Sequence, residues 1–116
     1  MKTPISQPAP VDTSSLGRAI VSLRRIQGWS QKDLAGKILK EDGQSITPQY
    51  LNDIEHDRRT PSSAHMVHQF ATVLGVNPDV LYLLARRVPD DIAQSGASTQ
   101  QIEKAFVAFR KEIKGR

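Results

Sequence analysis

The fold is decided by one stretch near the middle of the chain, TPQYLNDIEHDRR, which covers residues 47–59. Threonine followed by proline is typical of a helix start, because threonine caps free backbone N–H groups and proline fits the first helical turn. Leu51 and Ile54 are three residues apart, so they lie on the same face of the expected helix. The stretch therefore predicts a short amphipathic helix over residues 47–56.

The remaining faces of this helix carry hydrogen-bonding side chains, and two arginines follow its end. The residues concerned are Gln49, Tyr50, Asn52, Asp53, Arg58 and Arg59. A helix that enters the DNA major groove by its N-terminus presents such groups to base edges. Arginines just beyond the helix can bind DNA phosphates. Such contacts position a protein on the duplex but do not read its sequence. A solvated surface helix is the plainer interpretation of the same pattern.

Apolar residues recur at helical spacing on both sides of this stretch. Ser14 or Ser15 starts the first expected helix and Gly28 stops it. Ser30, with Asp33 three residues later, caps the second. The expected helices run over about 15–27 and 31–39, then from Ser62 or Ser63 to Gly75, from Asn77-Pro78 to before Pro89, and from about Thr99 to Lys114. The sequence therefore predicts an all-α chain.

The length of 116 residues suits one small domain with tails. We expect a disordered, Pro- and Ser-rich N-terminal tail over 1–13, a domain over 14–94, and a linker with a C-terminal helix over 95–116. No apolar run reaches the roughly 18 residues that span a bilayer, and the N-terminus lacks the apolar core of a signal peptide. Because the chain has no cysteine, disulfides and thiolate metal sites are excluded. We expect a cytoplasmic protein that does not enter membranes.

The net charge of +4 suits an acidic partner such as nucleic acid or an anionic membrane surface, although simple solubility explains it as well. Asp90 and Asp91 are adjacent carboxylates that point apart, without a nucleophile or base beside them. His65 and His68 are three residues apart, but no cysteine or obvious third ligand accompanies them. We therefore expect no enzymatic activity, no cofactor and no metal.

Four motifs occur in order along the chain: Ser-Gln-x-x-Leu-Ala, Leu-x-x-Ile-Glu, Arg-x-Pro-Ser and Leu-Gly-Val-x-x-x-x-Leu. They lie in WSQKDLAGKI…SITPQYLNDIEHDRRTPSS…FATVLGVNPDVLYLL. Through them, residues 15–86 resemble the Cro/repressor (XRE-like, lambda-repressor-like) helix-turn-helix family. The resemblance implies a five-helix lambda-repressor-like domain, here with an additional C-terminal helix. It also implies that the protein is a sequence-specific DNA-binding transcriptional regulator. We expect it to act as a repressor.

The resemblance further assigns roles to residues of this chain. It implies that Gln31 binds a phosphate and braces the recognition helix, and that Gln49 reads a base. Thr47 serves as the helix cap and as a candidate phosphate ligand. The candidate DNA-binding residues are Gln31, Gln44, Ser45, Thr47, Gln49, Tyr50, Asn52, Arg58 and Arg59.

Two departures from the family pattern stand out. Residues 39–44 look like an insertion of about six residues in a turn that is usually tight. Either the second helix is longer or the turn is a true loop; both preserve the fold, because loop insertions cost little. Asp57 replaces the glycine that usually ends the recognition helix, and aspartate tolerates left-handed geometry better than most residues.

Two charged residues lie on or near the expected apolar faces. Arg24 is four residues after Ile20, and Glu55 is four residues after Leu51. A lone charge there is costly, whereas a pair is tolerable. The family resemblance pairs the same two positions. We therefore expect an Arg24–Glu55 ion pair that joins the first helix to the third and sets the angle of the recognition helix.

The C-terminal helix carries an apolar stripe at spacings of four, three and four. The stripe consists of Ile102, Phe106, Phe109 and Ile113. It either packs against the chain's own core or forms a dimer interface, and we expect a homodimer because helix-turn-helix repressors bind two-fold symmetric operators. The alternative function is an antitoxin or another protein-interaction subunit whose C-terminal helix binds a partner.

Overall fold

The computed structural model describes residues 10–115, and the regular secondary structure over this range is helical. The helices are α1 (Leu16–Ile26), α2 (Gln31–Lys37), α3 (Pro48–Glu55), α4 (Ala64–Leu74), α5 (Pro78–Leu84), α6 (Asp90–Ala93) and α7 (Thr99–Lys114). The all-α prediction is confirmed. Residues 1–9, most of the expected N-terminal tail, lie outside the described range.

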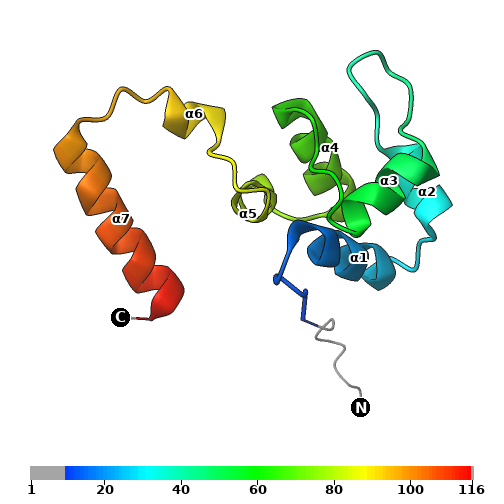
Figure 1. Cartoon of the computed structure of the whole chain (residues 1–116), viewed down its shortest axis with the longest axis horizontal. Coiled ribbons are helices and arrows are strands. Elements are labelled where there is room, and N and C mark those ends of the chain that lie inside the picture. The colour runs from blue at the N-terminus through cyan, green and yellow to red at the C-terminus, as the bar shows by residue number, and fades with distance from the viewer. Residues whose placement is uncertain (1–9, 116) are drawn as a thin grey trace.

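Helices α1 to α5 gather around one hydrophobic core, whereas α6 and α7 stand apart from them (Figure 1). The α3 helix packs on both α1 and α2, and α4 packs on α5. The largest fully buried side chains of the core are Phe70, Ile20, Leu34, Ile38, Leu51, Ile54, Leu81 and Val67. The core therefore covers the inner side of α3, whereas the residues of its other side are exposed or half-buried.

Core contacts extend slightly beyond α1 toward the N-terminus. Val11 is half-buried against the core, and the backbone N–H of Asp12 donates to Ser22 Oγ over 3.1 Å. The contacts of the domain therefore reach into residues 10–13, at the end of the segment for which the sequence predicts disorder.

Side-chain caps set where the helices begin. Ser15, Ser30, Thr47 and Ser63 each accept a backbone N–H of the turn that follows. At α2, Asp33 completes a capping box by accepting the N–H of Ser30, and this hydrogen bond, followed by the one from the Ser30 hydroxyl, lowers the pKa of the Asp33 carboxyl. Local sequence therefore determines the helix starts.

The helix ends differ more from expectation. The second helix stops at Lys37, because Ile38 is extended. The fifth stops at Leu84, well before Pro89, because Arg86 takes a left-handed conformation with a φ of 59°. The N–H of Arg87 then donates to the carbonyl of Tyr82, which closes the helix end. The chain leaves the core at this point.

Between α2 and α3 the chain forms a true loop, which settles the alternative that the sequence left open. This hairpin loop (residues 39–45) is closed by an isolated antiparallel bridge between Leu39 and Ser45. It projects beyond the α2–α3 pair in Figure 1. Both backbone groups of Leu39 are anchored to α4: its N–H donates to Gln69 Oε1 over 3.0 Å, and its carbonyl accepts from His65 Nε2 over 2.9 Å. The insertion is therefore a braced element.

No helix within residues 10–115 combines the length and the apolar character needed to cross a membrane.

Candidate nucleic-acid interface

The inner side of α3 is fixed by a buried ion pair. Arg24 Nε donates to Glu55 Oε2 over 2.7 Å, and Arg24 Nη2 donates to Glu55 Oε1 over 3.0 Å. The Glu55 side chain is 2% exposed and that of Arg24 is 11% exposed. A bidentate pair of this kind fixes direction as well as distance. The expected partners are therefore in contact.

Further hydrogen bonds complete the surroundings of this pair. Gln31 Nε2 donates to Glu55 Oε1 over 2.8 Å, and Arg24 Nη1 donates to the carbonyl of Trp29 over 2.9 Å. A buried charge is tolerable when its lone pairs and protons are satisfied in this way. Glu55 thus joins α3 to α1 through Arg24 and to α2 through Gln31.

The end of α3 makes an unusually close contact with α1. A Cβ atom on Gly17 would lie 2.5 Å from the carbonyl oxygen of Glu55 and 2.6 Å from that of Ile54. Only glycine fits, because real Cβ contacts are longer and both neighbours are backbone atoms. We did not predict this role from the sequence. The available signal was a glycine inside an otherwise periodic helix.

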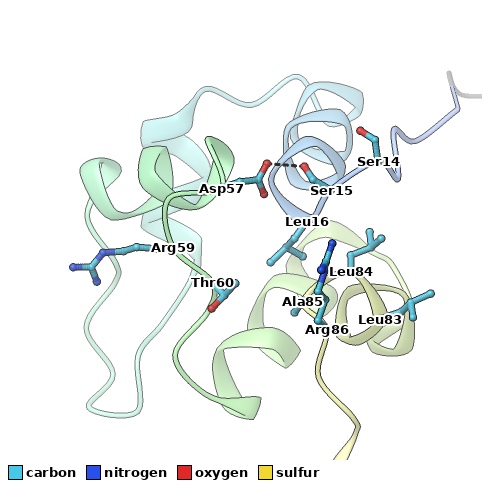
Figure 2. Close-up of a pocket in the computed structure, with 10 residues that line it drawn as sticks. All are labelled: Ser14, Ser15, Leu16, Asp57, Arg59, Thr60, Leu83, Leu84, Ala85 and Arg86. Atoms are coloured by element: carbon cyan, nitrogen blue, oxygen red, sulfur yellow. Dashed lines mark hydrogen bonds between the residues drawn. The ribbon is translucent and has the colours of Figure 1, made fainter.

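Asp57 closes the same junction. It takes a left-handed conformation with a φ of 59°, in line with the tolerance expected of aspartate at this position. Its Oδ1 accepts the N–H of Gly17 over 2.9 Å, and its Oδ2 accepts the Ser15 hydroxyl over 2.7 Å. Figure 2 shows Asp57 and Ser15 facing one another across the start of α1. The side chain that follows α3 therefore also accepts hydrogen bonds from the cap and the first turn of α1.

A hollow of about 510 Å³ lies beside this junction, between the start of α1, residues 57–60 and the end of α5. Leu16, Leu84 and Ala85 contribute apolar surface (Figure 2). Its carboxylate, Asp57, already accepts two hydrogen bonds from α1 and its cap. This carboxylate is therefore part of the α1–α3 junction, whereas Arg59, Thr60 and Arg86 add further polar groups to the hollow.

The outer side of α3 carries a second network, centred on Asp53. Gln49 Nε2 and Arg58 Nε each donate to Asp53 Oδ1 over 3.1 Å. Arg59 Nε lies 4.0 Å from Asp53 Oδ2, and the Arg59 guanidinium stacks 5.4 Å from the centre of the Tyr50 ring. Two arginines that follow the helix are thus held against its surface.

Asn52 connects the outer network to the inner one. Its Oδ1 accepts from Arg58 Nη2 over 2.8 Å, and its Nδ2 lies 3.5 Å from Gln31 Oε1, at the limit of a hydrogen bond. Most of the predicted DNA-binding residues therefore meet on one surface. The sequence did not indicate the central position of Asp53.

The other candidate residues lie at the edges of this surface or away from it. Thr47 is exposed and caps α3 by accepting the N–H of Tyr50 over 3.0 Å. Gln44 and Ser45 are exposed in the hairpin loop, where their backbones help to close it. Neither takes part in the contacts around Asp53. All four members of the α7 stripe are exposed.

The histidines have structural contacts. His65 anchors the hairpin loop, and the ring of His68 packs edge-on against Tyr82, with centroids 5.5 Å apart. Among residues 10–115, no group of three or more histidine or acidic side chains is arranged to hold a metal ion.

A helix-turn-helix family model matches residues 20–81, which is more than half of the 116-residue chain. The match begins within α1 and ends within α5. It includes α2 and α3, which Gln31 and Glu55 join. No curated protein and no solved structure matches the chain. The domain of this family is a DNA-binding regulatory domain. The chain belongs to the Cro/XRE-type helix-turn-helix family.

Proposed function

We propose that the protein is a sequence-specific transcriptional regulator that inserts α3 into the major groove of a two-fold symmetric operator, as a homodimer. Repression would follow from occupation of the operator. The supporting observation is the division of α3 into two sides. Its inner side is fixed through Glu55, while its outer side presents Gln49, Asn52 and the following arginines. A cytoplasmic location is part of the same proposal.

Gln49 is the best placed side chain for reading a base. It lies in the exposed first turn of α3, and it can form paired hydrogen bonds with adenine N6 and N7. Its amide orientation follows from Asp53, because a carboxylate only accepts and the Nε2 group must therefore face it. The carbonyl oxygen and one N–H of Gln49 remain available for a base edge.

Arg58 and Arg59 are proposed to bind phosphates. Arg58 already donates from Nε to Asp53 and from Nη2 to Asn52. A guanidinium has five N–H donors, so Arg58 keeps several of them for a phosphate while its side chain stays oriented. Gln31, Thr47 and Tyr50 complete the proposed contact surface, and Gln44 and Ser45 would approach DNA only at its margin.

Selection of duplexes from a random pool is the direct test of this function. A symmetric consensus with half-sites about one turn apart, roughly 34–36 Å, is the expected result. If the bound duplexes share no consensus and resemble the starting pool, sequence-specific binding is contradicted.

Replacing Gln49 with alanine should weaken binding to the selected duplex by roughly 1–3 kcal/mol, because one base loses its paired hydrogen bonds. Preference at that base pair should relax, while binding to random duplex changes little. Fluorescence anisotropy titrations with both duplexes measure the two effects. Gln100→Ala in α7 is the matched control and should leave both affinities unchanged. Equal behaviour of the two variants would remove Gln49 from the reading surface.

Replacing Asp53 with asparagine should strengthen binding to random duplex roughly threefold to tenfold, because a negative charge beside the phosphates is removed and two arginines are released. The salt dependence should steepen. The preference for the selected duplex should fall, because an asparagine amide both donates and accepts and so no longer fixes the amide orientation of Gln49. Titrations at several salt concentrations measure all three effects. Asp91→Asn makes the same charge change on α6. If both variants respond alike, Asp53 acts only through net charge.

A protein-interaction role, as in an antitoxin, is the second candidate, and the exposed apolar stripe of α7 favours it. Purification of the full chain from its native host distinguishes the two. A stable complex with a different protein that blocks DNA binding would support this second role.

A further inference from the structure

We propose that α7 pairs antiparallel with α7 of a second copy, through the stripe of Ile102, Phe106, Phe109 and Ile113. The proposal deepens the homodimer of the proposed function by naming its surface, orientation and flanking charges. The pairing itself requires no DNA, so it can stand or fail independently of DNA recognition.

The α7 helix is complete in itself. Ser98 and Gln101 form a capping box at its start, and Gly115 ends it in a left-handed conformation with a φ of 74°. All of its described residues are exposed, and the helix stands apart from α1–α5 (Figure 1). Its own caps thus favour a helix that no described part of the chain covers.

Four apolar side chains of α7, those of the stripe, lie along one face of the helix. Phe106 and Phe109 pack edge to face, with ring centroids 6.4 Å apart. These two side chains are 51% and 45% exposed, and the flanking isoleucines are exposed as well. Spacings of four, three and four are those of a short coiled-coil seam. A solvent-exposed apolar face of this kind is typical of a surface that binds another helix.

The charges beside the stripe identify a second copy as that helix. Glu103 and Arg110 flank it on one side, and Ala105 and Glu112 flank it on the other. In an antiparallel pair, equivalent flanks face one another. Glu103 of each copy then lies opposite Arg110 of the other, and two-fold symmetry makes this favourable contact twice. The lysines at 104 and 111 lie on the far side of the helix and stay in solvent.

A parallel pair would lose this complementarity. Opposite flanks face one another in a parallel pair, so that Arg110 would meet Ala105 of the other copy. The antiparallel arrangement also places Ile102 against Ile113 and Phe106 against Phe109, which fills the seam with apolar side chains. The helix dipoles oppose one another as well, which is the more favourable orientation.

The dimensions of an antiparallel pair suit a symmetric operator. At ~1.5 Å per residue, a helix of this length spans ~24 Å, so the two chains enter the pair that far apart. Residues 85–98 then connect each end to its own domain. The two domains can therefore lie one DNA turn apart, at roughly 34–36 Å. This step, unlike the pairing, rests on the proposed function.

Charge exchange tests the pairing in the full chain, by sedimentation equilibrium over a range of protein concentrations. Glu103→Arg and Arg110→Glu should each weaken the dimer about tenfold, because both symmetric contacts become repulsive. An equimolar mixture of the two single variants should restore the dimer, since each then faces the opposite charge. The double variant should restore it as well. Failure of the mixture to associate would overturn the antiparallel arrangement.

Stripe variants test the surface. Phe106→Asp with Phe109→Asp should give a monomer, and Val107→Asp, on a neighbouring face of the same helix, should leave the dimer intact. A dimer that survives the stripe variant, or an unmodified chain that stays monomeric at every concentration, would overturn the proposal. The monomeric variant should still bind a duplex with a single half-site.

If the unmodified chain forms the dimer but binds no DNA, the proposed function is refuted while the pairing of α7 still holds.

Discussion

Replacing Glu55 with glutamine is expected to lower the free energy of unfolding by about 3–5 kcal/mol, because it leaves the buried guanidinium of Arg24 without a counter-charge. The loss is large beside the total stability of roughly 5–15 kcal/mol that is usual for a domain. Glutamine keeps the size of the side chain, so the effect isolates charge from packing. Urea denaturation followed by circular dichroism measures it.

A double replacement provides the control for Glu55. Arg24→Met with Glu55→Leu removes both charges and keeps apolar volume at the site. The double variant should be less destabilised than Glu55→Gln, because no charge remains unpaired. If the double variant loses the sum of two independent single losses, the ion pair is not the reason that Glu55 stabilises the domain.

Replacing Gly17 with alanine is expected to destabilise the domain by about 3 kcal/mol, the upper end of the usual cost of overpacking. The new methyl group meets two backbone carbonyl oxygens at distances that atoms do not tolerate, so α1 and the end of α3 must separate. Their separation also strains the hydrogen bonds that Asp57 makes to α1. The same denaturation measurement detects the loss.

Gly36 supplies a matched control in α2. A Cβ atom there meets nothing within 4 Å. Gly36→Ala should therefore stabilise the domain by roughly 0.5–1 kcal/mol, since alanine is the better helix former. Opposite signs for the two alanines are the expected result. Equal gains would mean that α1 and α3 are not in the close contact described above.

Local chemistry made much of α3 predictable. A threonine cap before proline marks its start, and two apolar residues three apart define its buried face. Arg24 and Glu55 stood out because each interrupts an apolar row. Asp57 was recognisable as a residue that takes left-handed geometry in place of glycine. Each of these features depends on a few neighbouring residues or on a repeated spacing.

What escaped prediction depends on contacts between distant segments. The role of Gly17 requires the distance between α1 and α3, which no local pattern encodes. Asp53 becomes central only because Arg58 folds back over α3. His65 and Gln69 lie on α4, some thirty residues from the hairpin loop that they brace. Tertiary packing determines these features, so they appear only in the folded chain.

The carboxylate of Glu55 is shared by three helices, and this has a consequence for how the domain opens. If α1, α2 or α3 detached alone, it would leave charged or hydrogen-bonding groups of the others buried without partners. Partial unfolding at this point therefore carries the cost of unpaired buried groups, and we expect the three helices to unfold as one cooperative unit. Helix α3 therefore has no separate melting step, whereas α7, whose described residues are all exposed, can fray independently.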